Sequence, residues 1–185
     1  MTNTVKTSYR HGDLPAALLC SARTLLEKDG ITALKLRAIT RHAGVSATAA
    51  TPHFSNLKGL LSALAAQGFT ELADAMMPDH APAPRDVAIA YVHFAITNPG
   101  LFTLMFRSDT TDRNDVSLQS ASHRAFNRLS GMAETGQTGD HTATIIGLWG
   151  KVHGVAILMI EGLLNGITSL QTSEEQEAIL KQVFR

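Results

Sequence analysis

The apolar residues at the beginning of the chain recur at the spacing of an amphipathic helix. A first stripe predicts a helix over about residues 13–29 and consists of Leu14, Leu18, Ala22 and Leu25. Asp13 can cap this helix, and Gly30 can end it. A second stripe consists of Leu36, Ile39 and Ala43. Gly44 then allows a tight turn, and Ser46 can cap a third helix, so the pattern predicts two short helices joined by a turn.

The helical pattern continues through the remainder of the chain. A long stripe begins at Leu57 and ends before the proline-rich residues 78–84. Further stripes predict a helix around Val87, Tyr91 and Phe94, a short one at 101–107, and longer ones over about 113–134, about 140–168 and from Ser173, where SEEQ offers a capping box. No sustained alternation bounded by turns indicates a strand. We therefore predict an all-α protein with a three-helix head at residues 1–56 and a larger helical body at 57–185.

The net charge of the chain is zero but is unevenly divided. Residues 1–60 contain eight Lys or Arg and three Asp or Glu, a balance of +5. Because each sign totals sixteen, residues 61–185 contain eight basic and thirteen acidic residues, a balance of −5. A basic head favours a polyanionic partner, and the acidic body indicates a different role.

The cysteine content and the apolar segments indicate the compartment. Cys20 is the only cysteine, which excludes an internal disulfide and favours a reducing interior; its apolar neighbours predict a buried thiol. The N-terminal residues lack the apolar stretch of a secretory signal. Residues 145–167 are as long as a membrane span but contain Lys151, His153 and Glu161, which favours a buried helix of a soluble protein. We expect a cytoplasmic protein without membrane contact.

Two groups of motifs carry a family resemblance. Between residues 9 and 64, a long helix ending in Gly30 is followed by LRAITRHAGVS and then by HF before a Leu-rich helix. This order resembles the DNA-binding domain of the tetracycline-repressor (TetR) family of transcriptional regulators. Trp149, His153 and Gly154 form a Trp-x-x-x-His-Gly element similar to one C-terminal class of that family. The resemblance implies a helix-turn-helix DNA-binding domain at 1–56, a ligand-binding and dimerisation domain at 57–185, and a repressor that a small molecule releases from a palindromic operator.

The segment that would read DNA departs from the family pattern. Thr51 stands where an aromatic residue usually contacts a phosphate, Pro52 replaces a usual Tyr, Arg or Lys, and Leu57 replaces a usual Lys. Pro52 also predicts an early end of the recognition helix. Basic side chains on the second helix favour phosphate contacts, and small side chains offer methyl and hydroxyl groups to base edges. The candidate DNA-binding residues are Lys35, Arg37, Arg41, Ala47, Thr48, Ala49, Thr51, His53 and Lys58.

The second half of the chain predicts a mainly apolar ligand cavity, provided that its helices pack as in the family. The candidate ligand-binding residues are Phe94, Phe102, Met105, Phe106, Trp149, His153, Ile157 and Glu161. His153 and Glu161 stand out, because polar residues on an apolar helix require a partner, which a ligand or water could supply. The small residues Gly147, Gly150, Gly154 and Gly162 allow another helix to approach closely, and we predict a homodimer through the last two helices.

Two other classes of function bear on this interpretation. An enzyme is disfavoured, because no two histidines have the spacing of a helical metal site, Cys20 lacks a neighbouring ligand and no glycine-rich phosphate loop occurs. We therefore expect no catalytic residue, no metal and no cofactor. A TetR-like module that binds a small molecule or a protein, with weakened or lost sequence-specific DNA binding, remains an alternative because of Thr51, Pro52 and Leu57.

Overall fold

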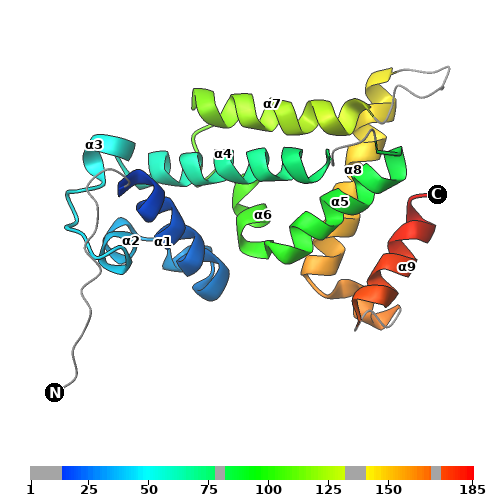
Figure 1. Ribbon diagram of the computed structural model, residues 1–185, viewed down its shortest axis with the longest axis horizontal. Helices are drawn as coiled ribbons and strands as arrows, with labels where there is room; N and C mark the ends of the chain where they lie inside the picture. The colour runs from blue at the N-terminus through cyan, green and yellow to red at the C-terminus, as the bar shows by residue number, and fades with distance from the viewer. Residues whose placement is uncertain (1–13, 78–81, 132–140, 168–171) are drawn as a thin grey trace.

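The polypeptide forms helices and no strands in the part that the computed structural model describes, residues 14–77, 82–131, 141–167 and 172–185. The head contains α1 (Leu14–Asp29), η1 (Ile31–Ala33), α2 (Leu36–His42) and α3 (Thr51–Phe54). The body contains α4 (Leu57–Ala75), α5 (Pro84–Thr97), α6 (Pro99–Met105), α7 (Val116–Ser130), α8 (His141–Ile160), η3 (Leu163–Gly166) and α9 (Ser173–Val183). The predicted all-α fold is confirmed, with α4 extending from the head into the body (Figure 1).

One face of α1 holds the head together. The buried residues of this small core include Leu18, Ala22, Leu26, Leu34, Ile39 and Ala50. Cys20 is exposed, so the predicted burial of its thiol is wrong. Two residues along a helix turn a side chain by about 200°, which places Cys20 nearly opposite Leu18. Asp13, the predicted cap of this helix, lies outside the described residues.

α4 begins at a tight junction with α3. The side chain of Asn56 caps α4 by accepting the N–H of Gly59 at 3.0 Å. Glycine is required at that position, because a Cβ would lie 2.2 Å from the carbonyl oxygen of Phe54. Further along, α4 is buried against α1, α6 and α7. α4 is therefore the central helix of the protein.

α7 lies along α4 and runs in the same direction (Figure 1). Ser62 Oγ accepts the N–H of Asp112, just before α7, at 2.7 Å. Further along, Arg124 donates to the carbonyl of Thr70 at 3.1 Å and to Asp74 at 3.0 Å. On the other side of the body, α5 packs against α8 and α9, and the chain bends by 108° between α5 and α6. This bend brings α6 against both α4 and α1.

The C-terminal helices differ from their predicted bounds. The helix predicted over about 140–168 ends at Ile160, because Gly162 adopts a left-handed conformation with φ of 67°. The capping box of α9 lies one residue earlier than predicted. Thr172 Oγ1 accepts the N–H of Glu175 at 3.1 Å, and the Glu175 carboxylate accepts the N–H of Thr172 at 3.0 Å.

α8 is largely uncovered in the single chain. Its buried residues are Val152 and Ala156, so the predicted buried helix is wrong for an isolated protomer. Thr142–Ile160 is also, among the described residues, the helix long and apolar enough to cross a membrane. The same length and composition occur in core helices of soluble proteins. α5 covers one side of α8, Trp149 meets Phe126 of α7, Lys151 lies over the ring of Phe184, and much of the remaining surface is exposed.

Candidate functional site

Four basic side chains are exposed on the head and just beyond it. They are Lys35, Arg37, Arg41 and Lys58, which we call the basic head surface. Residues 30–70 contain these four Lys or Arg and no Asp or Glu. None of the four forms an ion pair with another described residue. Because cations without a counter-ion attract phosphate, this surface fits a nucleic-acid backbone.

The recognition segment is a turn followed by a four-residue helix. Gly44 has a φ of 72° and forms the predicted tight turn, residues 47–50 form a second turn, and α3 follows. Pro52 lies in the first turn of α3, where a missing N–H breaks no hydrogen bond, so the prediction that it ends the helix is wrong. The Ser46 hydroxyl pairs with that of Thr48 at 3.2 Å and does not cap α3.

The small side chains of this segment face outward. Of the predicted DNA-binding residues in this segment, four are exposed, namely Ala47, Thr48, Thr51 and His53. Ala49 is half-buried and Ala50 belongs to the core of the head. This segment therefore presents small apolar or hydroxyl-bearing side chains and His53, and no long side chain that could reach far into a groove.

A cavity of about 490 Å³ lies within the body. Residues of α4 to α8 and of the loop after α6 line it, and it is open to solvent on one side, where lining residues such as Gln119 and His123 are exposed. The lining residues are Phe69, Leu72, Tyr91, Met105, Phe106, Arg107, Ser108, Thr111, Arg113, Leu118, Gln119, Ser122, His123, Ala125, Phe126, Leu129 and Trp149. The volume lies in the range of small-molecule sites, which are mostly apolar with a few polar groups.

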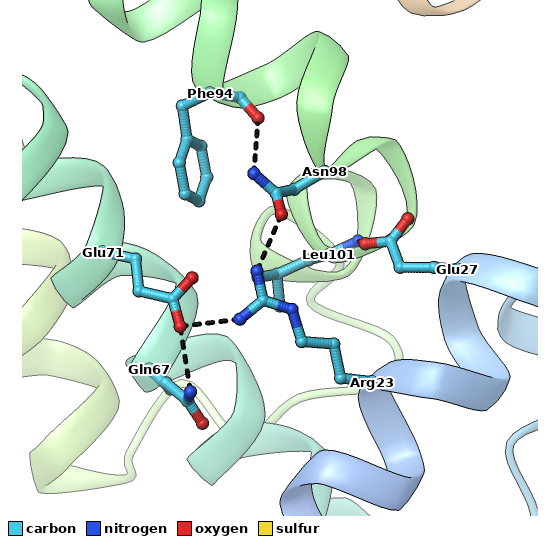
Figure 2. Close-up of polar contacts among 7 residues, drawn as sticks. All are labelled: Arg23, Glu27, Gln67, Glu71, Phe94, Asn98 and Leu101. Atoms are coloured by element: carbon cyan, nitrogen blue, oxygen red, sulfur yellow. Dashed lines mark hydrogen bonds and ion pairs between the residues drawn. The ribbon is translucent and has the colours of Figure 1, made fainter.

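The cavity includes some of the predicted ligand residues and omits others. Met105, Phe106 and Trp149 belong to its lining. The predicted residues outside it are Phe94, Phe102, His153, Ile157 and Glu161. Phe102 is fully buried beneath the cavity wall, and Phe94 lies beside the contact between head and body (Figure 2). Glu161 is exposed beyond the end of α8, because that helix stops at Ile160.

His153 is held in an aromatic cluster behind the cavity wall. Its Nδ1 lies 3.0 Å from the hydroxyl oxygen of Tyr91, and its ring stacks on Phe102 with a centroid distance of 5.3 Å and meets Phe106 at 4.5 Å. Burial lowers the pKa of His153 and raises the pKa of Tyr91, so both are neutral at pH 7. The polar partner that the sequence analysis assigned to a ligand or water is therefore Tyr91.

The residues that α7 contributes to the cavity are not among the predicted ligand-binding residues. Gln119, Ser122, His123, Phe126 and Leu129 all come from this helix. Their i, i+3 and i+4 spacing places them on neighbouring faces of a helix, which the sequence could have indicated. That α7 lies parallel to α4 and meets Trp149 of α8 is a tertiary fact that no local pattern contains.

Arg23 of α1 bridges the head and the body (Figure 2). Its Nη1 donates to Glu71 Oε1 on α4 at 2.7 Å, and its Nη2 donates to Asn98 Oδ1 at the end of α5, also at 2.7 Å. Gln67 donates to the same Glu71 oxygen at 2.9 Å, and Asn98 Nδ2 donates to the carbonyl of Phe94 at 3.0 Å. One guanidinium thus connects three helices.

Glu27, one turn further along α1, holds the start of α6. Its two carboxylate oxygens accept the N–H groups of Gly100 and Leu101, each at 2.9 Å, which places negative charge at a helix N-terminus. A Cβ on Gly100 would lie 3.0 Å from Glu27 Oε2 and 3.1 Å from the carbonyl of Leu26, so glycine permits this approach. We call Arg23, Glu27, Glu71 and Asn98 the head–body joint.

Solved structures with a similar fold cover nearly the whole chain. A protein of unknown function from Rhodococcus sp. RHA1 is 29% identical, with a TM-score of 0.76, over 97% of this chain and 98% of that one. A TetR family transcription regulator from Marinobacter aquaeolei VT8 is 14% identical, with a TM-score of 0.63, over 92% and 91%. BioQ, solved with its natural double-stranded DNA operator, is 18% identical, with a TM-score of 0.59, over 92% and 94%.

Two family models match both parts of the chain. The model for bacterial regulatory proteins of the tetR family matches residues 18–64, and the model for the tetracyclin repressor-like C-terminal domain matches residues 85–182. No curated protein matches the sequence. The second model alone covers more than half of the chain. The chain therefore belongs to the TetR family and is a DNA-binding transcriptional regulator, not an enzyme.

Proposed function

We propose that this protein is a cytoplasmic, homodimeric repressor that a small molecule releases from a palindromic DNA operator. The position of α6 is the observation that carries the proposal. Met105 and Phe106 at one end of this helix line the cavity. At the other end, the N–H groups of Gly100 and Leu101 donate hydrogen bonds to the carboxylate of Glu27 in the head. A single short helix therefore touches both the ligand site and the DNA-binding domain.

A bound ligand would act on two helices at once. Phe69 and Leu72 of α4 line the cavity together with the end of α6, and both helices lead to the head. In a dimer the two heads enter successive major grooves, about 34 Å apart, so a small tilt of α4 changes whether both heads fit. Ligand binding then lowers the affinity for DNA, and DNA binding lowers the affinity for the ligand by the same factor.

In this proposal the basic head surface contacts the DNA phosphates, and the recognition segment contacts the base edges. Lys35, Arg37, Arg41 and Lys58 contact phosphates, which sets affinity and its dependence on salt. The exposed methyl and hydroxyl groups, and the half-buried Ala49, approach base edges and thymine methyl groups. His53 is exposed at the same edge and is a further phosphate contact. The operator-bound structure of BioQ, which shares this fold, supports the assignment.

The uncovered face of α8 supports a dimer. A Cβ built on Gly147, Gly150 or Gly154 meets no atom within 4 Å, so their close-packing capacity is unused within the chain. Leu158 on the same face and Leu163 in the following turn are exposed large apolar residues. Exposed apolar surface of this kind marks an association site, and a two-fold pairing of α8 and α9 with their copies would cover it.

DNA binding is tested with fragments of the source genome. Fragments retained by the purified protein at two salt concentrations are sequenced, and we expect one palindromic site to survive at the higher concentration. Arg41→Ala should weaken binding to every sequence and lower the salt slope by about 1, because one phosphate contact is lost. Arg128→Ala serves as the control, since Arg128 is an exposed α7 residue outside the cavity lining. Equal effects of the two substitutions would contradict the assignment.

The ligand response is tested at the head–body joint. Compounds that raise the thermal stability of the protein are added to its operator complex, and we expect release. Glu27→Gln keeps the shape of the side chain but removes its charge from the α6 N-terminus, so it should reduce the ligand-induced loss of DNA affinity several-fold while ligand affinity is retained. Ligands that bind without changing DNA affinity would refute the repressor mechanism.

A ligand-binding module without sequence-specific DNA binding is the second candidate. It is favoured by the four-residue α3 and by the absence of Lys and Arg from residues 42–57, which leaves no side chain for a bidentate contact with guanine. Weak, salt-sensitive retention of all genome fragments alike would support this candidate over the repressor.

A further inference from the structure

The cavity has a polar end and an apolar end. Polar groups at one end come from the loop before α7 and from the first half of that helix, namely Arg107, Ser108, Thr111, Arg113, Gln119, Ser122 and His123. Phe126 and Leu129 follow in the second half, and Trp149 meets Phe126 with a centroid distance of 5.8 Å. Ten residues of helix separate Gln119 from Leu129, which corresponds to about 15 Å. The cavity therefore suits an elongated molecule with chemically different ends.

The polar end carries a cation without a counter-ion. Arg113 forms no ion pair and no side-chain hydrogen bond with another described residue. The neighbouring Arg107 is different, because its guanidinium donates to Asp109 through Nε at 2.9 Å and through Nη2. Among the described residues that line the cavity, none is Asp or Glu.

The acidic residues of the loop are directed to other groups. Asp109 pairs with Arg107, Asp112 accepts the N–H of Asn114 at 3.1 Å, and Asp115 caps α7 by accepting the N–H of Leu118 at 2.8 Å. Each carboxylate therefore has a local partner, and none of them belongs to the lining beside Arg113. Arg113 is exposed at the cavity, so its charge faces solvent there and is available to a molecule that enters.

We propose that the effector is an amphipathic carboxylate, with an aromatic or chain-like apolar body and its carboxylate on Arg113. This inference rests on the proposed ligand-responsive function and names its ligand class. The planar guanidinium of Arg matches a carboxylate with two parallel hydrogen bonds, and Gln119, Ser122 and His123 supply further polar partners. The apolar body lies among Phe106, Phe126 and Trp149, whose ring faces suit an aromatic group.

A matched set of probes separates charge from apolar burial. The probes are 8-phenyloctanoate, 8-phenyloctan-1-ol and 8-phenyloctylamine, which share one apolar body and differ in the head group. Trp149 is the only tryptophan of the chain and lines the cavity, so its fluorescence reports occupancy without reference to DNA. We expect the carboxylate to bind at least about tenfold more tightly than the alcohol, as a charge-assisted pair requires, and the amine to bind most weakly.

Two variants locate the carboxylate. Arg113→Gln should abolish the preference for the carboxylate over the alcohol, whereas Arg128→Gln, which removes an equal charge from α7 outside the lining, should leave it intact. Equal affinity for carboxylate and alcohol, no binding of the carboxylate, or an unchanged preference in Arg113→Gln would overturn the inference. If the carboxylate binds as expected but does not release operator DNA, the ligand class stands and the repressor mechanism fails.

Discussion

α4 and α8 are the two longest helices of the described chain and are both rich in apolar residues, yet their surroundings differ. α4 has 19 residues, of which ten are buried against the head, α6 and α7. α8 has 20 residues, but Val152 and Ala156 are the ones that its own chain buries. The comparison shows that the apolar composition of a helix predicts its burial but does not identify the partner that buries it.

The glycines of the two helices make the same contrast. A Cβ on Gly68 of α4 would lie 2.7 Å from the sulfur of Met105 and 3.0 Å from Cγ of Leu101. A Cβ on Gly150 of α8 would meet nothing within 4 Å. Gly68 therefore allows α6 to pack closely on α4 within the chain, whereas the surface at Gly150 is open to another chain. Ile146 beside it is 62% exposed, which is unusual for so large an apolar side chain.

The largest effect is expected from a wedge on the open face of α8. Gly150→Arg should convert a dimer into a monomer of 19.8 kDa, because a long charged side chain cannot be buried between two closely packed helices. Size-exclusion chromatography with light scattering measures the mass, and circular dichroism confirms that the helices persist. A monomeric unsubstituted protein would remove the proposed reason for the exposure of α8.

A smaller effect is expected from filling the close contact on α4. Gly68→Val should lower the free energy of unfolding by about 1–3 kcal/mol, because the added carbons overlap Met105 and Leu101. Gly68→Ala should change the stability less, since one carbon displaces less and alanine is the better helix former. Chemical denaturation at fixed protein concentration measures both, and unchanged stability in Gly68→Val would contradict the packing of α6 on α4.

Breaking the polar contact between α1 and α4 should cost less. Arg23→Gln removes the ion pair with Glu71 and the hydrogen bond to Asn98, and we expect a loss of about 1 kcal/mol, since both carboxylate and guanidinium are partly exposed. Thermal unfolding measures the loss. Arg124→Gln is the matched control on the other side of α4, where the ion pair with Asp74 is more exposed and a smaller loss follows.

The smallest effect concerns the protonation of His153 on α8. Burial lowers its pKa in the folded protein below the ordinary 6.5, so the unfolded chain binds the proton more readily. The contribution of His153 to the free energy of unfolding should therefore be independent of pH above about pH 6.5. Below that pH, the free energy of unfolding should fall as the pH decreases. Melting temperatures between about pH 5 and 8 test this, and His153→Gln should flatten the decline. A His153→Gln profile identical to that of the unsubstituted protein would contradict the assignment.

The sequence predicted much of the head and less of the cavity. The order of helices, the turn at Gly44 and the exposed basic residues Arg37 and Arg41 all follow from local spacing, and the structure agrees. Pro52 lies in the first turn of α3, against the prediction, because a proline is suited both to the first turn of a helix and to the position just after one, and local sequence does not distinguish the two. Cys20 is exposed, against the prediction, because apolar neighbours do not specify the face of a helix.

What the sequence determined by itself is the set of helices and the charge of the head, because helical periodicity, caps and the distribution of Lys and Arg are local properties. Tertiary structure alone decided that Arg23 and Glu27 join the head to α4 and α6, that Tyr91 satisfies His153, and that Arg113 stands at a cavity without a counter-ion. Each of these contacts joins residues distant in sequence or different helices, and such pairings depend on how helices cross. Periodicity identifies which face of a helix is buried, but packing selects what that face meets.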